Sequence, residues 1–353
     1  MATISFDSNI PAVSFTYDFD EVTITTDLPA VKASVTDKAG RTLYESILYA
    51  YDGKVTIYDL ARVFEEHMEN HDETFDIFTL KVESKENQSV SASLTYHVLY
   101  SKTRYPGSAA DWATRHFFNA AETKTSCLGS VEQLHCWFAA GSMAQERRTY
   151  VYVIDGEIMT TDWAEQTAVR VETAQMRTIE VDYNAIVEEL QADRLLSVSV
   201  AQQDRFATIF YYDQEVLPFM FLSQFNTLDI ATLICSVTRK ATTEKSMATC
   251  NRKVKVYDRE DMYSFELQTA PMTAEMAELA EKLCQARETW LYTGGNAPAD
   301  RYKIVITDYT AEHSDSDEKL PSYKISFKFE DGRLVMTDNL SEIFTPQFLP
   351  QFN

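Results

Sequence analysis

Two histidines stand at a spacing that is typical of metal-binding helices. His67 and His71 are four residues apart, so on an α-helix they face the same way and can bind one zinc ion. Glu69 stands one place too late for the metalloprotease pattern, and the sequence shows no third ligand. The pair also lies where its helix is expected to fray. We therefore interpret the two histidines as solvated groups at a helix end, and we predict no metal site.

His135 and Cys136 carry the side chains of a cysteine nucleophile and its base. They are adjacent within a predicted strand, however, and neighbouring residues of a strand point to opposite faces. They therefore cannot form the hydrogen-bonded pair that this chemistry requires. The chain has no Gly-x-Ser-x-Gly elbow and no glycine-rich phosphate loop, and Gly294-Gly295 is typical of an ordinary turn. We predict a protein that is not an enzyme and holds no cofactor.

An acidic segment, His313–Glu318, separates two predicted strands. Three carboxylates close together can hold calcium, which prefers oxygen ligands. The segment lacks the glycine and the terminal glutamate of an EF-hand loop, and a solvated hairpin tip has the same composition. We favour the hairpin tip, and calcium binding is the alternative.

The charge of the chain opposes binding to nucleic acid. The 353 residues contain 54 acidic and 32 basic side chains, which gives a net charge of −22. Proteins bind nucleic acid largely through Lys and Arg contacts to phosphates. The basic runs, Arg147-Arg148 and 252–255, are too short to offset this charge. We therefore predict no nucleic-acid partner.

Cysteine usage and hydropathy indicate the compartment. The five cysteines are odd in number and widely spaced, without a Cys-x-x-Cys pair, which favours free thiols in a reducing compartment. Cross-strand pairs of Cys127 with Cys136, or of Cys235 with Cys250, are the alternative. The first residues lack a secretory pattern, and no apolar run reaches the ~18 residues of a membrane span. We expect a protein made in the cytoplasm without membrane insertion.

One pattern occurs twice, about 120 residues apart. A short strand, 55–58, precedes the predicted helix N-cap Asp59; the strand 178–181 precedes Asp182 in the same way. Each helix has one apolar face, and the residue before each cap can pack onto the next turn as a hydrophobic staple. Two strand-like runs follow each helix: 75–82 and 91–100 in the first copy, 195–201 and 206–212 in the second. The chain therefore contains two copies of one β-rich unit.

The remaining segments complete a mainly β (α+β) protein. Turn residues and helical spacing across 105–125 predict a short helical connector, with its helix over 109–121. In the last part, 228–237, 253–257 and 263–268 have the composition of strands, and Pro271 and Thr273 open an amphipathic helix. We predict β-rich units at 1–104 and 126–216, the connector 105–125 between them, and an α+β unit at 217–353.

The C-terminal segment is rich in apolar side chains. Two prolines prevent it from forming a central strand or a continuous helix. Each large apolar group would gain roughly 1.5–3 kcal/mol from full burial. The segment either packs on its own unit or forms an arm that docks on a neighbouring subunit. Its candidate assembly contacts are Ile343, Phe344, Phe348, Leu349 and Phe352.

Residues 218–336 resemble a family of uncharacterised structural proteins. The likeness rests on the phrase Phe221–Asp229, the strand that follows it, the helix 271–290 with Trp290-Leu291-Tyr292, and the strand 323–330. In this order the segments are similar to the C-terminal part of tail-associated virion proteins from phages and prophages of gut Bacteroidetes. The resemblance implies a virion or tail component that works as a scaffold or an adhesion part, and it implies no catalytic residues.

Together these observations predict a structural subunit of a phage or prophage tail or virion. Its expected partners are other virion or tail proteins, or copies of itself, and it would become particle-associated after synthesis. The alternative is a modular protein that binds glycans or cell surfaces through exposed tryptophans: Trp112, Trp137, Trp163 and Trp290. An enzyme without a sequence signature is a third class.

Overall fold

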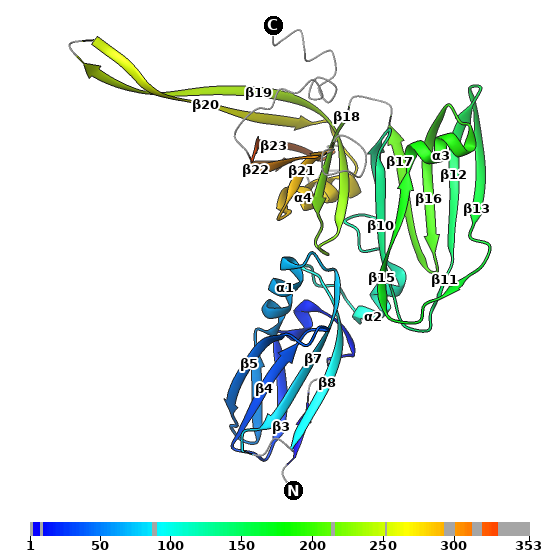
Figure 1. Ribbon diagram of the computed structural model, residues 1–353. Helices are drawn as coiled ribbons and strands as arrows, with labels where there is room; N and C mark the ends of the chain where they lie inside the picture. Colours follow the sequence, from blue (N-terminus) through cyan, green and yellow to red (C-terminus); the bar gives the residue numbers. More distant parts are fainter. Residues whose placement is uncertain are drawn as a thin grey trace.

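The structure is a computed structural model that describes residues 3–7, 10–86, 90–212, 216–250, 253–292, 301–312 and 320–330. Three β-rich units follow one another along the chain, and the short helix α2 (Ala109–Arg115) lies between the first and the second (Figure 1). The predicted class, mainly β with a few short helices, is confirmed. None of the helices in the described ranges is long and apolar enough to cross a membrane.

The first unit packs two sheets around one core. The larger sheet has the order β2-β8-β7-β4-β5 and the smaller one β1-β3-β6. Inward residues alternate along the strands, as in β4, where Val31, Ala33 and Val35 are fully buried. The strands of the first unit are β1 (Ile4–Phe6), β2 (Val13–Phe15), β3 (Glu21–Thr26), β4 (Ala30–Thr36), β5 (Thr42–Tyr49), β6 (Lys54–Tyr58), β7 (Phe75–Ser84) and β8 (Ser91–Leu99). Its helices are a 3-10 helix at Thr16–Phe19 and α1 at Leu60–Asn70.

The second unit repeats this topology. Its main sheet has the order β13-β12-β16-β17-β9, and β10 pairs with β15. In both units the first strand of the sheet lies parallel to the last one, β2 beside β8 and β9 beside β17, and a helix precedes the central hairpin. The elements are β9 (Thr123–Cys127), β10 (Val131–Phe138), β11 (Met143–Ala144), β12 (Glu146–Ile154), β13 (Glu157–Ala164), β14 (Val169–Arg170), β15 (Gln175–Asp182), α3 (Tyr183–Leu190), β16 (Arg194–Gln202) and β17 (Arg205–Tyr212).

The two copies differ at the start of their helices. The Asp182 carboxylate caps α3, since it accepts hydrogen bonds from the amides of Asn184 and Ala185. Asp59 precedes α1 in a left-handed conformation, φ 61°, and its side chain makes no cap bond. Tyr58, predicted to staple α1, is 64% exposed. The repeat is therefore shared in topology, while the predicted capping of α1 is wrong.

The third unit is a closed barrel with the order β18-β19-β20-β23-β22-β21, and α4 packs into its core. The Thr273 hydroxyl caps α4 as predicted, by accepting from the amide of Met276. The strands 253–257 and 263–268 are one continuous strand here, and strand 228–237 extends much further. The bounds are β18 (Val216–Leu222), β19 (Leu228–Cys250), β20 (Lys253–Thr269), α4 (Ala274–Gln285), β21 (Thr289–Tyr292), β22 (Arg301–Glu312) and β23 (Ser322–Phe329).

The connector helix is shorter than predicted. It ends at Arg115, and the next residue is extended. Phe117 and Phe118 then enter two different apolar cores, which an extended backbone permits because successive side chains point to opposite sides. The sequence pattern misled here, because it treated Phe117 as an apolar member of a helix together with Trp112 and Ala120.

Candidate functional site

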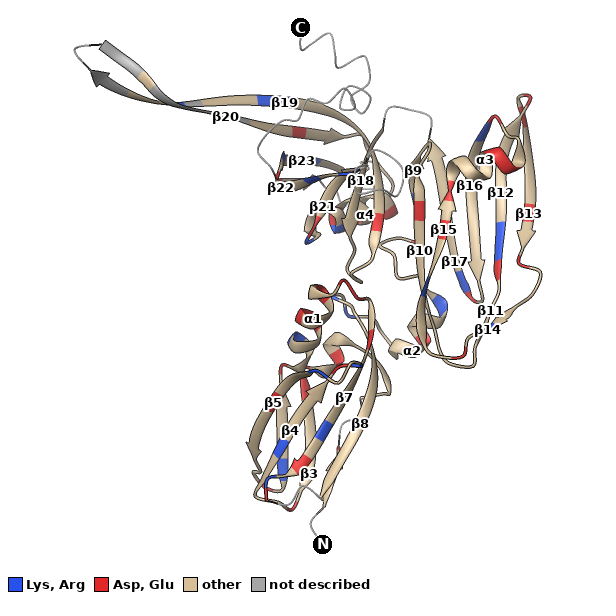
Figure 2. Cartoon of the chain, in the orientation of Figure 1, with Lys and Arg blue, Asp and Glu red and all other residues tan. Residues whose placement is uncertain are grey.

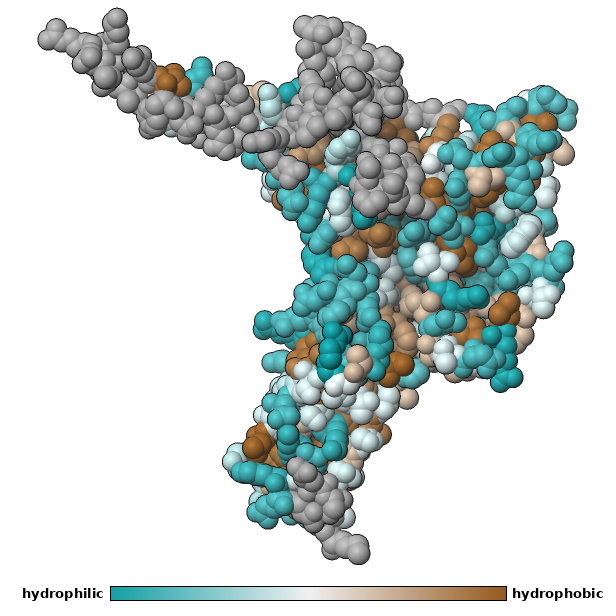
Figure 3. Space-filling view, in the orientation of Figure 1, coloured by the Kyte–Doolittle hydropathy of each residue, from teal (hydrophilic) through white to brown (hydrophobic). Residues whose placement is uncertain are grey.

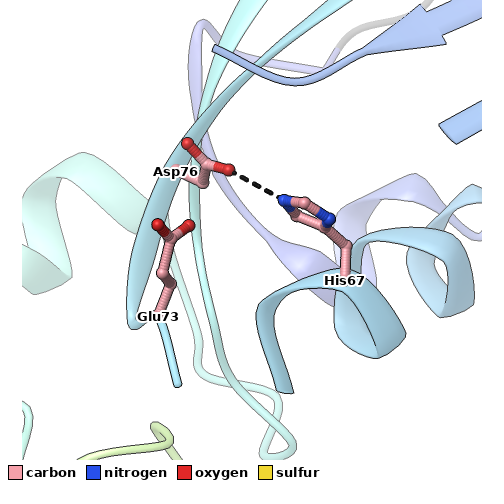
Figure 4. Close-up of side chains that lie close together, drawn as sticks. All are labelled: His67, Glu73 and Asp76. Carbon is pink, nitrogen blue, oxygen red and sulfur yellow. Dashed lines mark hydrogen bonds and ion pairs between the residues drawn. The ribbon is translucent and has the colours of Figure 1, made fainter. Parts of the chain in front are cut away.

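A cluster of charged side chains lies at the end of α1 in the first unit (Figure 4). His67 projects from the last turns of α1, Asp76 from β7, and Glu73 from the loop between them. One ligand atom from each of the three lies within 4.8 Å of the other two. The His67 Nε2 atom is 3.2 Å from Asp76 Oδ2 and 3.9 Å from Oδ2 of Asp37, which follows β4. Three carboxylates therefore converge on one imidazole.

The cluster is largely removed from solvent. The side chains of Asp37 and Asp76 are 0% and 1% exposed, and that of His67 is 6% exposed. The interpretation of His67 as a solvated group at a frayed helix end is therefore wrong. It failed because α1 ends against β7, where Phe78 packs on the His67 ring.

The ring of His71 lies beside that of His67, with centroids 4.4 Å apart, but its nitrogen atoms face other groups. Its Nδ1 atom lies 2.8 Å from the backbone oxygen of His67, and its Nε2 atom faces Arg41 at 3.3 Å. The ligand-like partner of His67 is Asp76 instead. A signal for it was present in the sequence, since Asp76 occupies an inward position of β7, two residues before the buried Phe78.

Two basic residues hold the carboxylates in place. Lys38 Nζ lies 2.6 Å from Glu73 Oε1 and 3.2 Å from Asp76 Oδ1, and Arg41 Nε donates to Asp37 at 2.6 Å. Burial alone would raise the pKa of Asp37, but the hydrogen bonds and charge of Arg41 outweigh it, so that this pKa lies below its ordinary value. Burial would lower the pKa of Lys38, yet Glu73 and Asp76 raise it. The cluster thus places two basic side chains directly beside its carboxyl groups.

His135 and Cys136 are separated by the geometry of β10. The His135 Nδ1 atom lies 3.0 Å from the Thr178 hydroxyl, while the Cys136 thiol donates to the Arg177 carbonyl at 3.7 Å. Burial raises the pKa of the Cys136 thiol to about 12. A thiol with such a pKa is a poor nucleophile at neutral pH.

Cys127, Cys235 and Cys284 are free thiols as well, so the alternative of a Cys127–Cys136 bond is wrong, and the side chain of Cys250 lies outside the described residues. The Gly294-Gly295 turn, the acidic segment 313–318 and the C-terminal contacts lie outside the described residues. Those contacts are Ile343, Phe344, Phe348, Leu349 and Phe352.

An aromatic cluster joins all three units around Trp112 of α2. Its indole lies 5.6 Å from the Phe15 ring of the first unit and 5.0 Å from the Phe225 ring of the third. His116 stacks on it at 4.9 Å. Trp137 is 2% exposed, and only Trp163 is more than a third exposed among the four tryptophans. The tryptophans therefore line no common face.

Three buried charges connect the second and third units. Lys124 on β9 forms ion pairs with Glu132 on β10, at 2.6 Å, and with Asp229 on β19. All three side chains are at most 1% exposed. Asp229 also accepts from the backbone amide of Ala120 at 2.5 Å. This triad fixes the barrel against the second unit at the base of β19.

The hairpin formed by β19 and β20 extends beyond the barrel, away from the other two units (Figure 1). β19 has 23 residues and β20 has 17. Between the pairs Lys240–Ser264 and Cys250–Lys253, each strand pairs only with the other within the described ranges. At the strand rise this part is about 35 Å long. We call it the arm.

Charge and hydropathy distinguish the arm from the rest of the chain. Acidic side chains are distributed over the strands and helices of the three units (Figure 2), and the face of the molecule drawn in Figure 3 is largely hydrophilic. By contrast, the sequence 245–256 has four basic residues and no Asp or Glu, and the acidic residues of the arm, Glu244, Asp258, Glu260 and Asp261, lie outside it. Met247 and Val256 pair across the two strands, and they are 61% and 51% exposed.

Comparison with known proteins gives no family. No protein-family model and no curated protein matches the sequence. Among solved structures, trypsin-activated alpha-2-macroglobulin from Escherichia coli is 8% identical, with 89% of this chain and 25% of that chain covered, at a TM-score of 0.22. The plexin A4 extracellular region is 8% identical, with 95% of this chain and 40% of that chain covered, at a TM-score of 0.22. Dpr2 Ig1-Ig2 in its complex with DIP-Theta is 9% identical, with 93% of this chain and 90% of that chain covered, at a TM-score of 0.21. The chain spans about a quarter of the length of that macroglobulin, and at such TM-scores the likenesses carry no argument about function.

Proposed function

We propose that the protein is a non-catalytic structural subunit of a phage or prophage tail or virion, and that the arm is one of its assembly elements. The observation that carries this proposal is the arm itself. An isolated two-stranded ribbon is at best marginally stable in water, because neither of its faces is buried. A chain that extends such a ribbon from a packed barrel gains most from it when another subunit covers it.

The end of the arm carries exposed apolar side chains of the kind that are buried in protein–protein contacts. Met247 and Val256 form one exposed apolar pair, and burial of such side chains is favourable by roughly 1.5–3 kcal/mol each. The basic residues of 245–256 would meet electrostatic attraction on an acidic surface. A second copy of this chain offers an acidic surface, because the net charge of the chain is −22. We therefore assign a second copy of this chain as the partner of the arm.

The strand β19, which continues into the arm, is anchored to the other two units at its opposite end. The Lys124–Glu132–Asp229 triad holds β19 where it enters the barrel. Asn226, just before β19, donates to the Met68 and Glu73 carbonyls of the first unit at 3.2 Å each. An arm anchored to two other units supports a subunit that positions its neighbours, as the resemblance to tail-associated proteins implies.

The test shortens the arm without opening the barrel. Residues 241–263 are replaced by Asn-Gly, which joins Lys240 to Ser264 through a tight hairpin turn at an existing cross-strand pair. We expect light scattering to give a defined oligomer for the full chain and a monomer for the shortened chain. Oligomerisation should also weaken when NaCl rises from about 50 to about 500 mM, because salt screens exposed charges.

Two further variants make the test specific. Met247→Thr with Val256→Thr should weaken association, whereas Val305→Thr, at a 48% exposed position of the barrel, should leave it unchanged. Removal of residues beyond Leu340 tests the C-terminal contacts separately. A full chain that stays monomeric at every concentration would refute self-association through the arm.

Glycan or surface binding is the second proposal, and it is favoured by one groove. A cavity of about 580 Å³ beside α2 is lined by Tyr105, Asp111, Asn119 and Gln224. Aromatic edges beside planar polar side chains suit a sugar. Asn119, however, bonds the backbone of residues 133 and 135, so it has little left for a ligand. Glycan-array binding that Asp111→Ala abolishes, with the oligomeric state unchanged, would favour this proposal over assembly.

A further inference from the structure

We propose that the cluster of His67, Glu73 and Asp76, with Asp37 beside it, is a binding site for one divalent transition-metal ion, for which Zn²⁺ is the probe. The three ligand atoms already lie within 4.8 Å of one another. In tetrahedral zinc sites with bonds of about 2.0–2.2 Å, neighbouring ligand atoms are about 3.3–3.5 Å apart. The Nε2–Oδ2 distance of 3.2 Å between His67 and Asp76 is close to that value.

The ligand set indicates the type of metal. One imidazole nitrogen with two or three carboxylates suits Zn²⁺ and similar first-row ions. Calcium takes six to eight oxygen ligands, which this cluster with its imidazole does not offer. The Glu73 Oε2 atom is buried and has no hydrogen-bond partner, so it is available to bind an ion.

The ligands are held in place by surrounding groups. Asp37 Oδ1 accepts from the amides of Ala39 and Arg41 at 2.9 and 2.8 Å, and Asp76 Oδ1 accepts from the amide of Ile77 at 2.8 Å. The Oδ2 atoms of both aspartates face the His67 ring. Contacts of this kind orient metal ligands and strengthen binding. The site is therefore preorganised by backbone groups that remain in place whether or not a metal is bound.

The ammonium group of Lys38 shows where the carboxylates of Glu73 and Asp76 together attract a cation. Its ammonium group bonds both Glu73 and Asp76, yet its side chain is 53% exposed. The side chain can thus move out to solvent when a divalent ion replaces its charge. Lys38 and the metal compete for the same carboxylates, so removal of Lys38 should tighten metal binding.

A bound ion would connect three parts of the first unit: the turn after β4, the end of α1 and the start of β7. The same region contacts the third unit, because Asn226 donates to the Glu73 carbonyl and Arg287 pairs with Glu69 of α1. Metal binding would therefore stiffen the junction from which the barrel and its arm extend. This inference does not depend on the proposed assembly function.

The experiment is calorimetric titration of the full chain, freed of metal by a chelator, with ZnCl₂. We expect one ion per chain with micromolar or tighter affinity. His67→Gln should weaken binding at least ~100-fold, and Lys38→Ala should tighten it by ~10-fold. His116→Gln is the matched control and should leave the affinity unchanged, because His116 pairs with Glu122 at an exposed site.

A second measurement keeps the test decisive should His67→Gln fail to fold. Co²⁺ bound to the unaltered chain should give visible absorption bands of a site with nitrogen and oxygen ligands, and Zn²⁺ should remove them in a one-to-one titration. Binding that is absent, that survives His67→Gln, or that weakens in Lys38→Ala would overturn the proposal.

Discussion

Replacing Lys124 with Met should weaken the link between the second and third units more than any surface change. The substitution keeps the length of the side chain and removes its charge. Glu132 and Asp229, both fully buried, then have no cation beside them. Removing one partner of a buried ion pair costs about 3–5 kcal/mol, because the remaining charge stays desolvated.

The magnitude follows from the burial of the triad. With a urea m-value of about 2–3 kcal/mol/M, a loss of that size lowers the unfolding midpoint by about 1–2.5 M. Fluorescence of the buried Trp137 and circular dichroism report the transition. Lys240→Met is the matched control: its pair with Glu266 is exposed, so the free energy of unfolding should change by no more than about 0.5 kcal/mol.

Glu132→Gln should behave in the opposite way. Burial raises the pKa of Glu132, and the charge of Asp229 adds to this effect, against the opposing attraction of Lys124. Glu132 and Asp229 therefore share one buried cation, Lys124. Gln at position 132 leaves a single pair of Lys124 with Asp229, so the change in stability at pH 7 should be small or favourable.

The pH dependence has a definite sign. Because the pKa of Glu132 is higher in the folded chain, protonated Glu132 contributes stability below its ordinary pKa of 4.5. This contribution is lost as the pH rises through the raised value. The stability of Glu132→Gln relative to the unaltered chain should therefore increase from pH 4 upward. An equal loss in Lys124→Met and Glu132→Gln would refute the charge balance described here.

Three further predictions concern caps, thiols and the junction of the first unit. Asp182→Ala should cost ~1 kcal/mol of unfolding free energy in urea titrations, whereas Asp59→Gly should be neutral or stabilising, because Asp59 makes no cap bond and is left-handed. Cys136 should react slowly with iodoacetamide at pH 7 in the folded chain, since burial raises its pKa to about 12; mass spectrometry after timed labelling checks this. Asn226→Gly keeps the left-handed backbone (φ 60°) but removes three side-chain hydrogen bonds, those to the Met68 and Glu73 carbonyls and that from Arg287, so amides near Met68 should exchange faster in hydrogen-exchange measurements.

The repeat and the class of fold could be predicted because both depend on local patterns. Alternating apolar residues placed β7, β8, β16 and β17 within one or two residues of their observed bounds. The closure of the barrel could not be predicted in this way. It depends on pairings between distant segments, such as Phe219 with Leu291, and nothing within either strand specifies its partner.

The segment 253–257 was predicted as a strand, but the long hairpin to which it belongs was not predicted. A strand is recognised in a sequence by one buried face, and beyond Lys240 the arm buries none against the barrel. The charged cluster was missed in part because Asp37 lies 30 residues before His67. The fold alone brings those two side chains together, and the only local signal was Asp76 at a core position of β7.

The difference between the two repeats follows from what each helix end contacts. In α3 the position that corresponds to His67 is Leu190, which packs against the apolar core of its own unit. In α1 the same end faces the third unit, where Asn226 and Arg287 make polar contacts with Met68 and Glu69. His67 itself faces the Asp37 and Asp76 carboxylates, which an apolar side chain would leave without this partner, whereas a charged residue at 190 would lie against the apolar core of the second unit. The same topology therefore requires opposite chemistry at one position, because only in the first copy do buried carboxylates lie beside it.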